Sequence, residues 1–127
     1  MKIMYLCITK SYHRLGDFRR ETIYECTRKY WKLKDFELSK ANEADFIVGI
    51  ADRQIKGVYK NLSGWKMVKN MPELLNDTEV KDHSEYQDRY AFDGEEVTSS
   101  ETIEEIKKDY ADHPFRFNVS YVIHYNF

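Results

Sequence analysis

The segment 44–65, ADFIVGIADRQIKGVYKNLSGW, constrains the fold of this chain more than any other. Apolar residues recur at every second position from 46 to 50, and again from 55 to 59 after a short polar break. A period of two in a segment rich in Ile, Val, Phe and Tyr predicts two β-strands joined as a hairpin. Gly49 and Gly57 lie inside these strands, where glycine often marks a β-bulge or a close approach of other atoms. We expect this hairpin to form the centre of a small sheet.

The rest of the chain supplies strands and short helices around the hairpin. Apolar and polar residues alternate cleanly over 115–127, which makes this segment the strongest strand prediction in the chain. Thr98 and Glu101 have the spacing of a capping box and predict a helix start. The acidic segment 70–84 predicts a mobile loop, and Asp93-Gly94 predicts a turn. The other predicted strands are 2–9, 65–69 and 86–92, and the predicted helices lie within 21–33, 35–43 and 99–110.

These elements predict one α+β domain over residues 1–127, with a mostly antiparallel curved sheet or small open barrel flanked by two to three short helices. No apolar run approaches the ~20 residues that a membrane-spanning helix needs, so we expect no membrane partner. Cys7 and Cys26 follow no disulfide pattern, and the N-terminus lacks the cleavage-site pattern of a signal peptide. The sequence therefore predicts a cytoplasmic protein with reduced cysteines.

Charge is distributed unevenly although the net charge is only −2. Residues 1–72 contain 15 Lys and Arg against 8 Asp and Glu, whereas residues 73–127 contain 5 against 14. A local basic field can bind phosphates even in a slightly acidic chain. The same cations could equally form a solvated face. Segment 10–34 is the most basic, with Lys10, Arg14, Arg19, Arg20, Arg28, Lys29, Lys32 and Lys34.

The first candidate binding residues combine positive charge with aromatic rings. Arg28 could bind a phosphate or a guanine edge, and Tyr30 and Trp31 could stack on an unpaired base. The alternative is that both rings fill the core where the helix ends. Tyr59 and Trp65, with Lys56 interleaved on the same hairpin, form a second candidate platform, although core packing is again the alternative.

Two further polar residues are candidates for nucleic-acid contacts. Arg89, in RYAFDG, could reach a phosphate or pair with a neighbouring acid. Asn118 lies opposite the aromatic face of the last predicted strand, where it could bind a base edge or satisfy a backbone group. The four histidines show no HExxH or other metal-binding spacing, and there is no glycine-rich phosphate loop. We therefore expect no catalytic residues, metal or cofactor.

Four segments carry a further pattern: ECTRKYWKL, ANEADFIVGIADRQIKGVYKNLSGWKMV, DRYAFDGEEV and FNVSYVIHYNF. Together they resemble a small domain family of bacteria and phages, some members of which stand beside nuclease domains. The arrangement is similar to PUA-like folds, the group that includes ASCH, EVE and SRA domains. This resemblance implies a nucleic-acid reader, for plain or modified bases, acting in the host cytoplasm if the chain is phage-encoded. Lys29 and Val119-Ser120 depart from the family pattern, which expects glycine at the first position and proline with a basic residue at the second.

The expected function is thus non-catalytic binding of DNA, RNA or a nucleotide. The alternative is a phage-encoded effector that binds and inhibits a host or defence protein through its acidic C-terminal half. Nuclease or base chemistry is a third hypothesis, for which the sequence offers no residue set.

Overall fold

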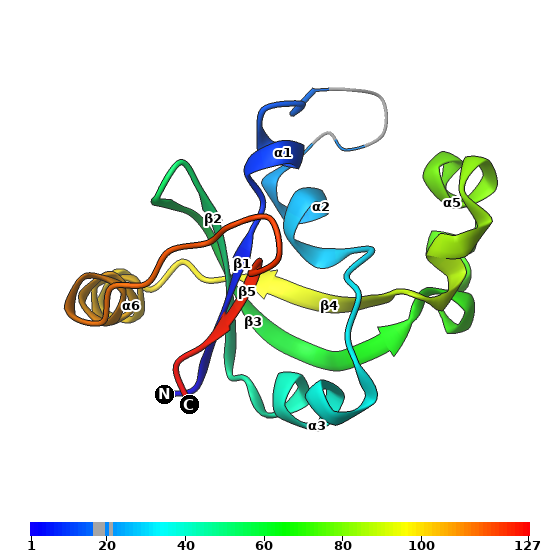
Figure 1. Cartoon of the computed structure of the whole chain (residues 1–127). Helices are drawn as coiled ribbons and strands as arrows, with labels where there is room; N and C mark the ends of the chain where they lie inside the picture. Colours follow the sequence, from blue (N-terminus) through cyan, green and yellow to red (C-terminus); the bar gives the residue numbers. More distant parts are fainter. Residues whose placement is uncertain (17–19, 21) are drawn as a thin grey trace.

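The computed structural model describes residues 1–16, 20 and 22–127. The chain is an α+β fold built on an open five-stranded mixed sheet, with strand order β4-β3-β2-β1-β5 (Figure 1). β1 and β2 are parallel, and the other neighbouring pairs are antiparallel, so the predicted antiparallel character is confirmed for most of the sheet. No helix among the described residues is long and apolar enough to cross a membrane. The strands are β1 (Ile3–Cys7), β2 (Phe46–Ala51), β3 (Gln54–Met67), β4 (Tyr90–Glu96) and β5 (Ile123–Tyr125).

The predicted hairpin is confirmed as β2 and β3, with Asp52 and Arg53 as its turn. The pairing register shifts after Gly49, which leaves Lys56 as an extra residue on β3. A Cβ atom on Gly49 would lie 2.6 Å from Thr27 Oγ1, so the glycine is needed for helix packing. β3 also continues past its predicted end to Met67, because the expected turn at 63–64 is a second irregularity within the strand.

The described residues form more helices than the two to three that the sequence predicted. The prediction that segment 70–84 is a loop is wrong, because this segment contains two short helices. Pro72 begins the first helix, and Asp77 caps the second by accepting a hydrogen bond from the Glu79 amide. In α6 the cap is Ser99, not Thr98 as predicted. Glu21, in the predicted first helix, lies outside the described residues. The helices are α1 (Thr9–Tyr12), α2 (Ile23–Arg28), α3 (Asp35–Glu43), α4 (Pro72–Leu75), α5 (Thr78–Asp82) and α6 (Ser100–Asp112), with 3₁₀ turns η1 (Val68–Asn70) and η2 (Ser84–Asp88).

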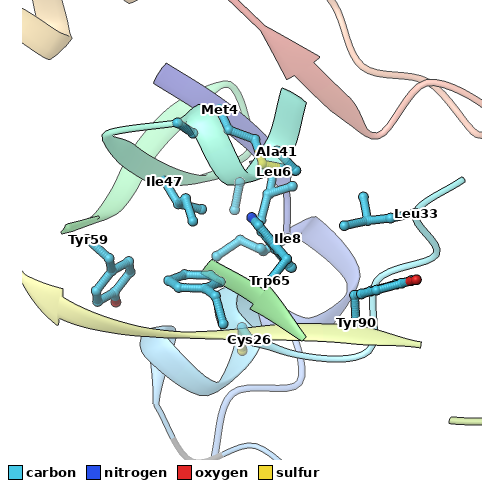
Figure 2. Close-up of a cluster of buried hydrophobic side chains, with 13 residues drawn as sticks. Met4, Leu6, Ile8, Cys26, Leu33, Ala41, Ile47, Tyr59, Trp65 and Tyr90 are labelled. Atoms are coloured by element: carbon cyan, nitrogen blue, oxygen red, sulfur yellow. The ribbon is translucent and has the colours of Figure 1, made fainter. Parts of the chain in front are cut away.

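Both faces of the sheet are covered, and alternate residues of β1 supply the two cores. Met4 and Leu6 point toward the core under α2 and α3 (Figure 2). Ile3 and Tyr5 point to the opposite core, which Ile106 of α6 closes. Full burial of side chains of this size contributes about 1.5–3 kcal/mol each. The Tyr5 hydroxyl donates a 2.7 Å hydrogen bond to Asp109, another residue of α6.

The prediction of one long strand over 115–127 is wrong, since only Ile123–Tyr125 pairs in the sheet. Asn118 interrupts it: its side-chain oxygen accepts hydrogen bonds from the backbone amides of Ser120 and Tyr121, both at 2.9 Å. The resulting turn lets Phe115 pack against the α6-side core, while β5 packs against the opposite core. The 86–92 strand is also shifted, because β4 begins at Tyr90 and runs through the predicted turn at 93–94.

Candidate functional site

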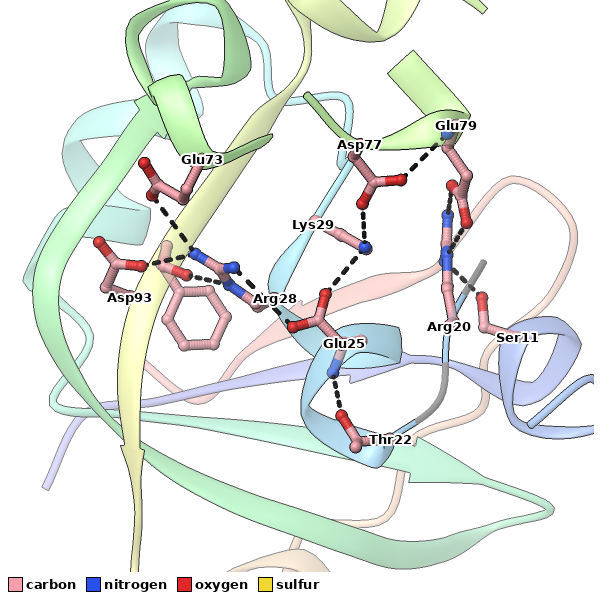
Figure 3. Close-up of polar contacts among 11 residues, drawn as sticks. Ser11, Arg20, Thr22, Glu25, Arg28, Lys29, Glu73, Asp77, Glu79 and Asp93 are labelled. Carbon is pink, nitrogen blue, oxygen red and sulfur yellow. Dashed lines mark hydrogen bonds and ion pairs between the residues drawn. The ribbon is translucent and has the colours of Figure 1, made fainter. Parts of the chain in front are cut away.

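The basic residues around α2, namely Arg20, Arg28 and Lys29, form ion pairs with carboxylates of the same chain (Figure 3). Arg28 is buried at the end of α2. Its Nε donates to the Phe92 carbonyl at 3.1 Å, and its NH2 group lies 2.5 Å from Asp93. Arg20 makes two 3.0 Å hydrogen bonds to the Glu79 carboxylate. The donors of Arg28, which the sequence predicts to contact a phosphate, therefore already have partners within the protein.

Lys29 is the most enclosed cation of this network. Its side chain is 2% exposed, and its Nζ lies 2.6 Å from Asp77 and 2.8 Å from Glu25. Burial alone would raise the pKa of Asp77, but hydrogen bonds from Lys29 and from the Glu79 amide outweigh it and lower this pKa. The network attaches the α4–α5 segment to α2 (Figure 3), so its cations hold the fold together and do not project into solvent.

The rings predicted to stack on bases are largely inside the protein. Tyr59 and Trp65 are each 4% exposed and lie in the core of Figure 2. Tyr30 is 5% exposed and stacks on Tyr86 at 4.7 Å. Trp31 packs against the same core as Tyr59 and donates its indole N–H to the Thr27 carbonyl at 2.7 Å. These rings therefore pack within the protein, as the alternative of core packing expects.

Lys56 and Arg89, the other two cations predicted to contact nucleic acid, lie in different parts of the structure. Lys56, the bulge residue, extends over the Tyr12 ring at 4.8 Å and donates to Gln54 at 3.0 Å. Arg89 lies over the Tyr86 ring at 4.5 Å. The structure does not bring the predicted site residues together on one surface.

A different concave site lies where the two parallel strands end. The chain leaves β1 into α1 and leaves β2 into the 52–53 turn, and segment 115–122 crosses beside them before returning as β5 (Figure 1). These parts enclose a pocket of about 470 Å³, hereafter the β1–β2 pocket. The carboxyl ends of parallel strands are where open α/β sheets commonly bind ligands, because the chain there diverges into loops.

Aromatic rings form one wall of the β1–β2 pocket. Tyr110, Phe115 and Phe117 line it. Phe115 stacks on His124 at 3.8 Å with an interplanar angle of 14°, and it meets Phe117 edge-on at 5.1 Å. Burial lowers the pKa of His124, which keeps the imidazole neutral near pH 7. The wall is thus an assembly of rings held by mutual packing.

Cations and hydrogen-bonding groups complete the pocket. Lys10, Arg53 and Arg116 line it, and among the described residues none of them forms an ion pair with a carboxylate. The acidic residue on the wall, Asp52, is instead engaged by His13 at 2.9 Å. Asn118 also lines the pocket, and its side-chain hydrogen bonds to described residues use only Oδ1, leaving Nδ2 for a ligand.

Of the predicted site residues, Asn118 alone belongs to this pocket. The sequence does not single out Arg53, because the pattern there predicts only the connection of a hairpin. Lys10 is one of eight cations in segment 10–34, and nothing in the pattern distinguishes it from the others. The alternating pattern places Phe115 and Phe117 on one face of a predicted strand. No group of three or more His, Cys, Asp or Glu that could hold a metal occurs among the described residues.

Comparison of the chain with protein-family models, curated proteins and solved structures finds no match.

Proposed function

We propose that this chain binds nucleic acid and holds one nucleotide in the β1–β2 pocket. The observation that carries the proposal is the contrast between two groups of cations. Arg20, Arg28 and Lys29 around α2 form ion pairs with carboxylates. Lys10, Arg53 and Arg116 line the same pocket as the aromatic wall and form no ion pair with a carboxylate in the part of the chain that the structure describes. A nucleotide combines a phosphate, which needs cations, with a base, which stacks on flat rings.

The dimensions and polarity of the pocket support a nucleotide ligand. Its volume of about 470 Å³ lies within the range of roughly 300–1,000 Å³ typical of small-molecule sites. A base stacked on Phe115 or Phe117 would gain about 1–3 kcal/mol. Asn118 Nδ2 and the Thr9 side chain lie on the same lining and could bind the polar edge of a plain or modified base.

This function requires no catalytic group, metal or cofactor from the chain. It agrees with the reader role implied by the resemblance to PUA-like domains, and that relationship stays a prediction. The site proposed here differs from the one expected at Tyr30, Trp31, Tyr59 and Trp65.

Fluorescence anisotropy with labelled single-stranded DNA, single-stranded RNA and duplex DNA tests the proposal. Affinity should fall with salt, and three phosphate contacts on a single strand predict a log–log slope of about −2. Arg116→Gln should weaken binding and make the slope shallower by about 0.7. The control is Lys69→Gln, an exposed cation on η1 outside the pocket, which should leave both quantities unchanged. Absence of binding to every probe at low salt would overturn the proposal.

The alternative, a protein partner bound by the acidic half, predicts a different outcome. Several acids of that half, including Asp77, Glu79 and Asp93, already pair with cations of the first half. A stoichiometric protein partner that survives nuclease treatment, combined with no affinity for nucleic acid, would favour the alternative.

A further inference from the structure

The turn between β2 and β3 has unusual backbone dihedral angles, and its two residues line the β1–β2 pocket. Asp52 and Arg53 have φ angles of 51° and 63°, in the left-handed region. Two-residue hairpin turns with positive φ at both positions favour Asn-Gly or Asp-Gly, because glycine has no Cβ to clash with the backbone. Asp52 fits the first position of this pattern, whereas Arg53 occupies the position where glycine is the unstrained residue. Such outliers cluster at functional sites.

The side chain of Arg53 is exposed and lines the β1–β2 pocket. It lies close enough to Tyr110 for its charge to oppose the rise that burial causes in the pKa of that phenol. Its sequence neighbour Asp52 is engaged by His13 at 2.9 Å. Within the described part of the chain, Arg53 has no carboxylate partner, so its guanidinium can bind an external anion.

We propose that Arg53 binds the phosphate of the nucleotide in the pocket, and that the strained turn is retained because it places this guanidinium at the ligand. The inference rests on the proposed function and adds to it the ligand class: a nucleotide with a phosphate beside the pocketed base, as opposed to a free base or nucleoside. Arginine suits this role because its planar fork donates two parallel hydrogen bonds to phosphate.

The experiment measures stability and binding on the same variants. Arg53→Gly should raise Tm by a few degrees, since glycine adopts this backbone without strain. It should also weaken binding to a single-stranded probe at least tenfold and make the salt slope shallower by about 0.7. Arg53→Lys should retain the charge and the strain, so Tm should stay unchanged while part of the affinity is kept. Arg53→Asn, which tolerates the left-handed region, repeats the glycine test if that variant folds poorly.

Competition with small ligands tests the ligand class. A nucleoside monophosphate should displace the probe from the wild type better than the matching nucleoside, and this preference should disappear in Arg53→Gly. If the wild type binds the probe and Arg53→Gly binds equally well, the role of Arg53 is overturned while the pocket proposal stands. If the wild type binds no nucleic acid, the proposed function fails, and this inference fails with it.

Discussion

Replacing Lys29 with Met removes the cation at the centre of the α2 network without removing its volume. The Nζ atom lies within 2.8 Å of two carboxylates, and the side chain is 2% exposed. Removing one partner of a buried ion pair costs about 3–5 kcal/mol, because the other charge stays buried without compensation. Asp77 and Glu25 keep 16% and 29% side-chain exposure, which allows some hydration. We therefore expect the low end of the range, about 3 kcal/mol.

Urea unfolding followed by circular dichroism measures this loss. With an m-value of about 2 kcal/mol/M, the midpoint should fall by about 1.5 M. The control is Lys107→Met, which should cost less than about 1 kcal/mol, because the Lys107 side chain is 57% exposed and its Nζ lies 3.6 Å from Glu104. Equal midpoints for the two variants would refute the argument that burial makes the Lys29 pairs structural.

Acid pH offers an independent check on the same network. The pKa of Asp77 is lowered from 3.8 in the folded chain, so its contribution to stability is present above that value. This contribution is lost as pH falls below 3.8 toward the folded pKa. The free energy of unfolding of Lys29→Met should therefore change less between pH 5 and pH 2 than that of the wild type, because the variant lacks one of the hydrogen-bond donors that lower this pKa. An unchanged acid dependence would contradict the assignment.

Three further predictions follow from packing and burial. Gly49→Ala should lower stability by about 1–3 kcal/mol in thermal melts, because the new Cβ would lie 2.6 Å from Thr27 Oγ1; unchanged stability would mean that α2 can shift freely. In the native protein Cys26 should react with a thiol reagent far more slowly than Cys7, since burial raises the pKa of the Cys26 thiol; equal rates would contradict this. Above pH 10 stability should fall as pH rises, because five buried or half-buried tyrosines have raised pKa values and ionise more readily in the unfolded chain. A spectrophotometric titration that shows all ten tyrosines ionising together in the folded state would refute this. The tyrosines concerned are Tyr5, Tyr30, Tyr59, Tyr110 and Tyr125.

The hairpin was predictable because its signal is local. Alternating apolar residues and a short polar break identify β2, β3 and their turn without knowledge of the rest of the chain. Gly49 and Gly57 also predicted a close approach of other atoms, since a glycine inside a strand often marks such crowding. By contrast, the alternation in 115–127 predicted one long strand and was wrong. The side chain of Asn118 accepts hydrogen bonds from the following backbone amides and so makes a turn that periodicity does not reveal.

The sequence alone determined that the chain is α+β, that its centre is a hairpin, and that its first half is basic and rich in aromatic residues. Only the tertiary structure decided which cations are neutralised: Lys29 pairs with Asp77, 48 residues away, whereas Arg53 does not pair with any described carboxylate. It also decided which rings are accessible, and it assembled the pocket from the ends of β1 and β2 and segment 115–122. Charge and aromaticity are properties of single residues, but pairing and burial depend on contacts between segments distant in sequence, and those contacts exist only after folding.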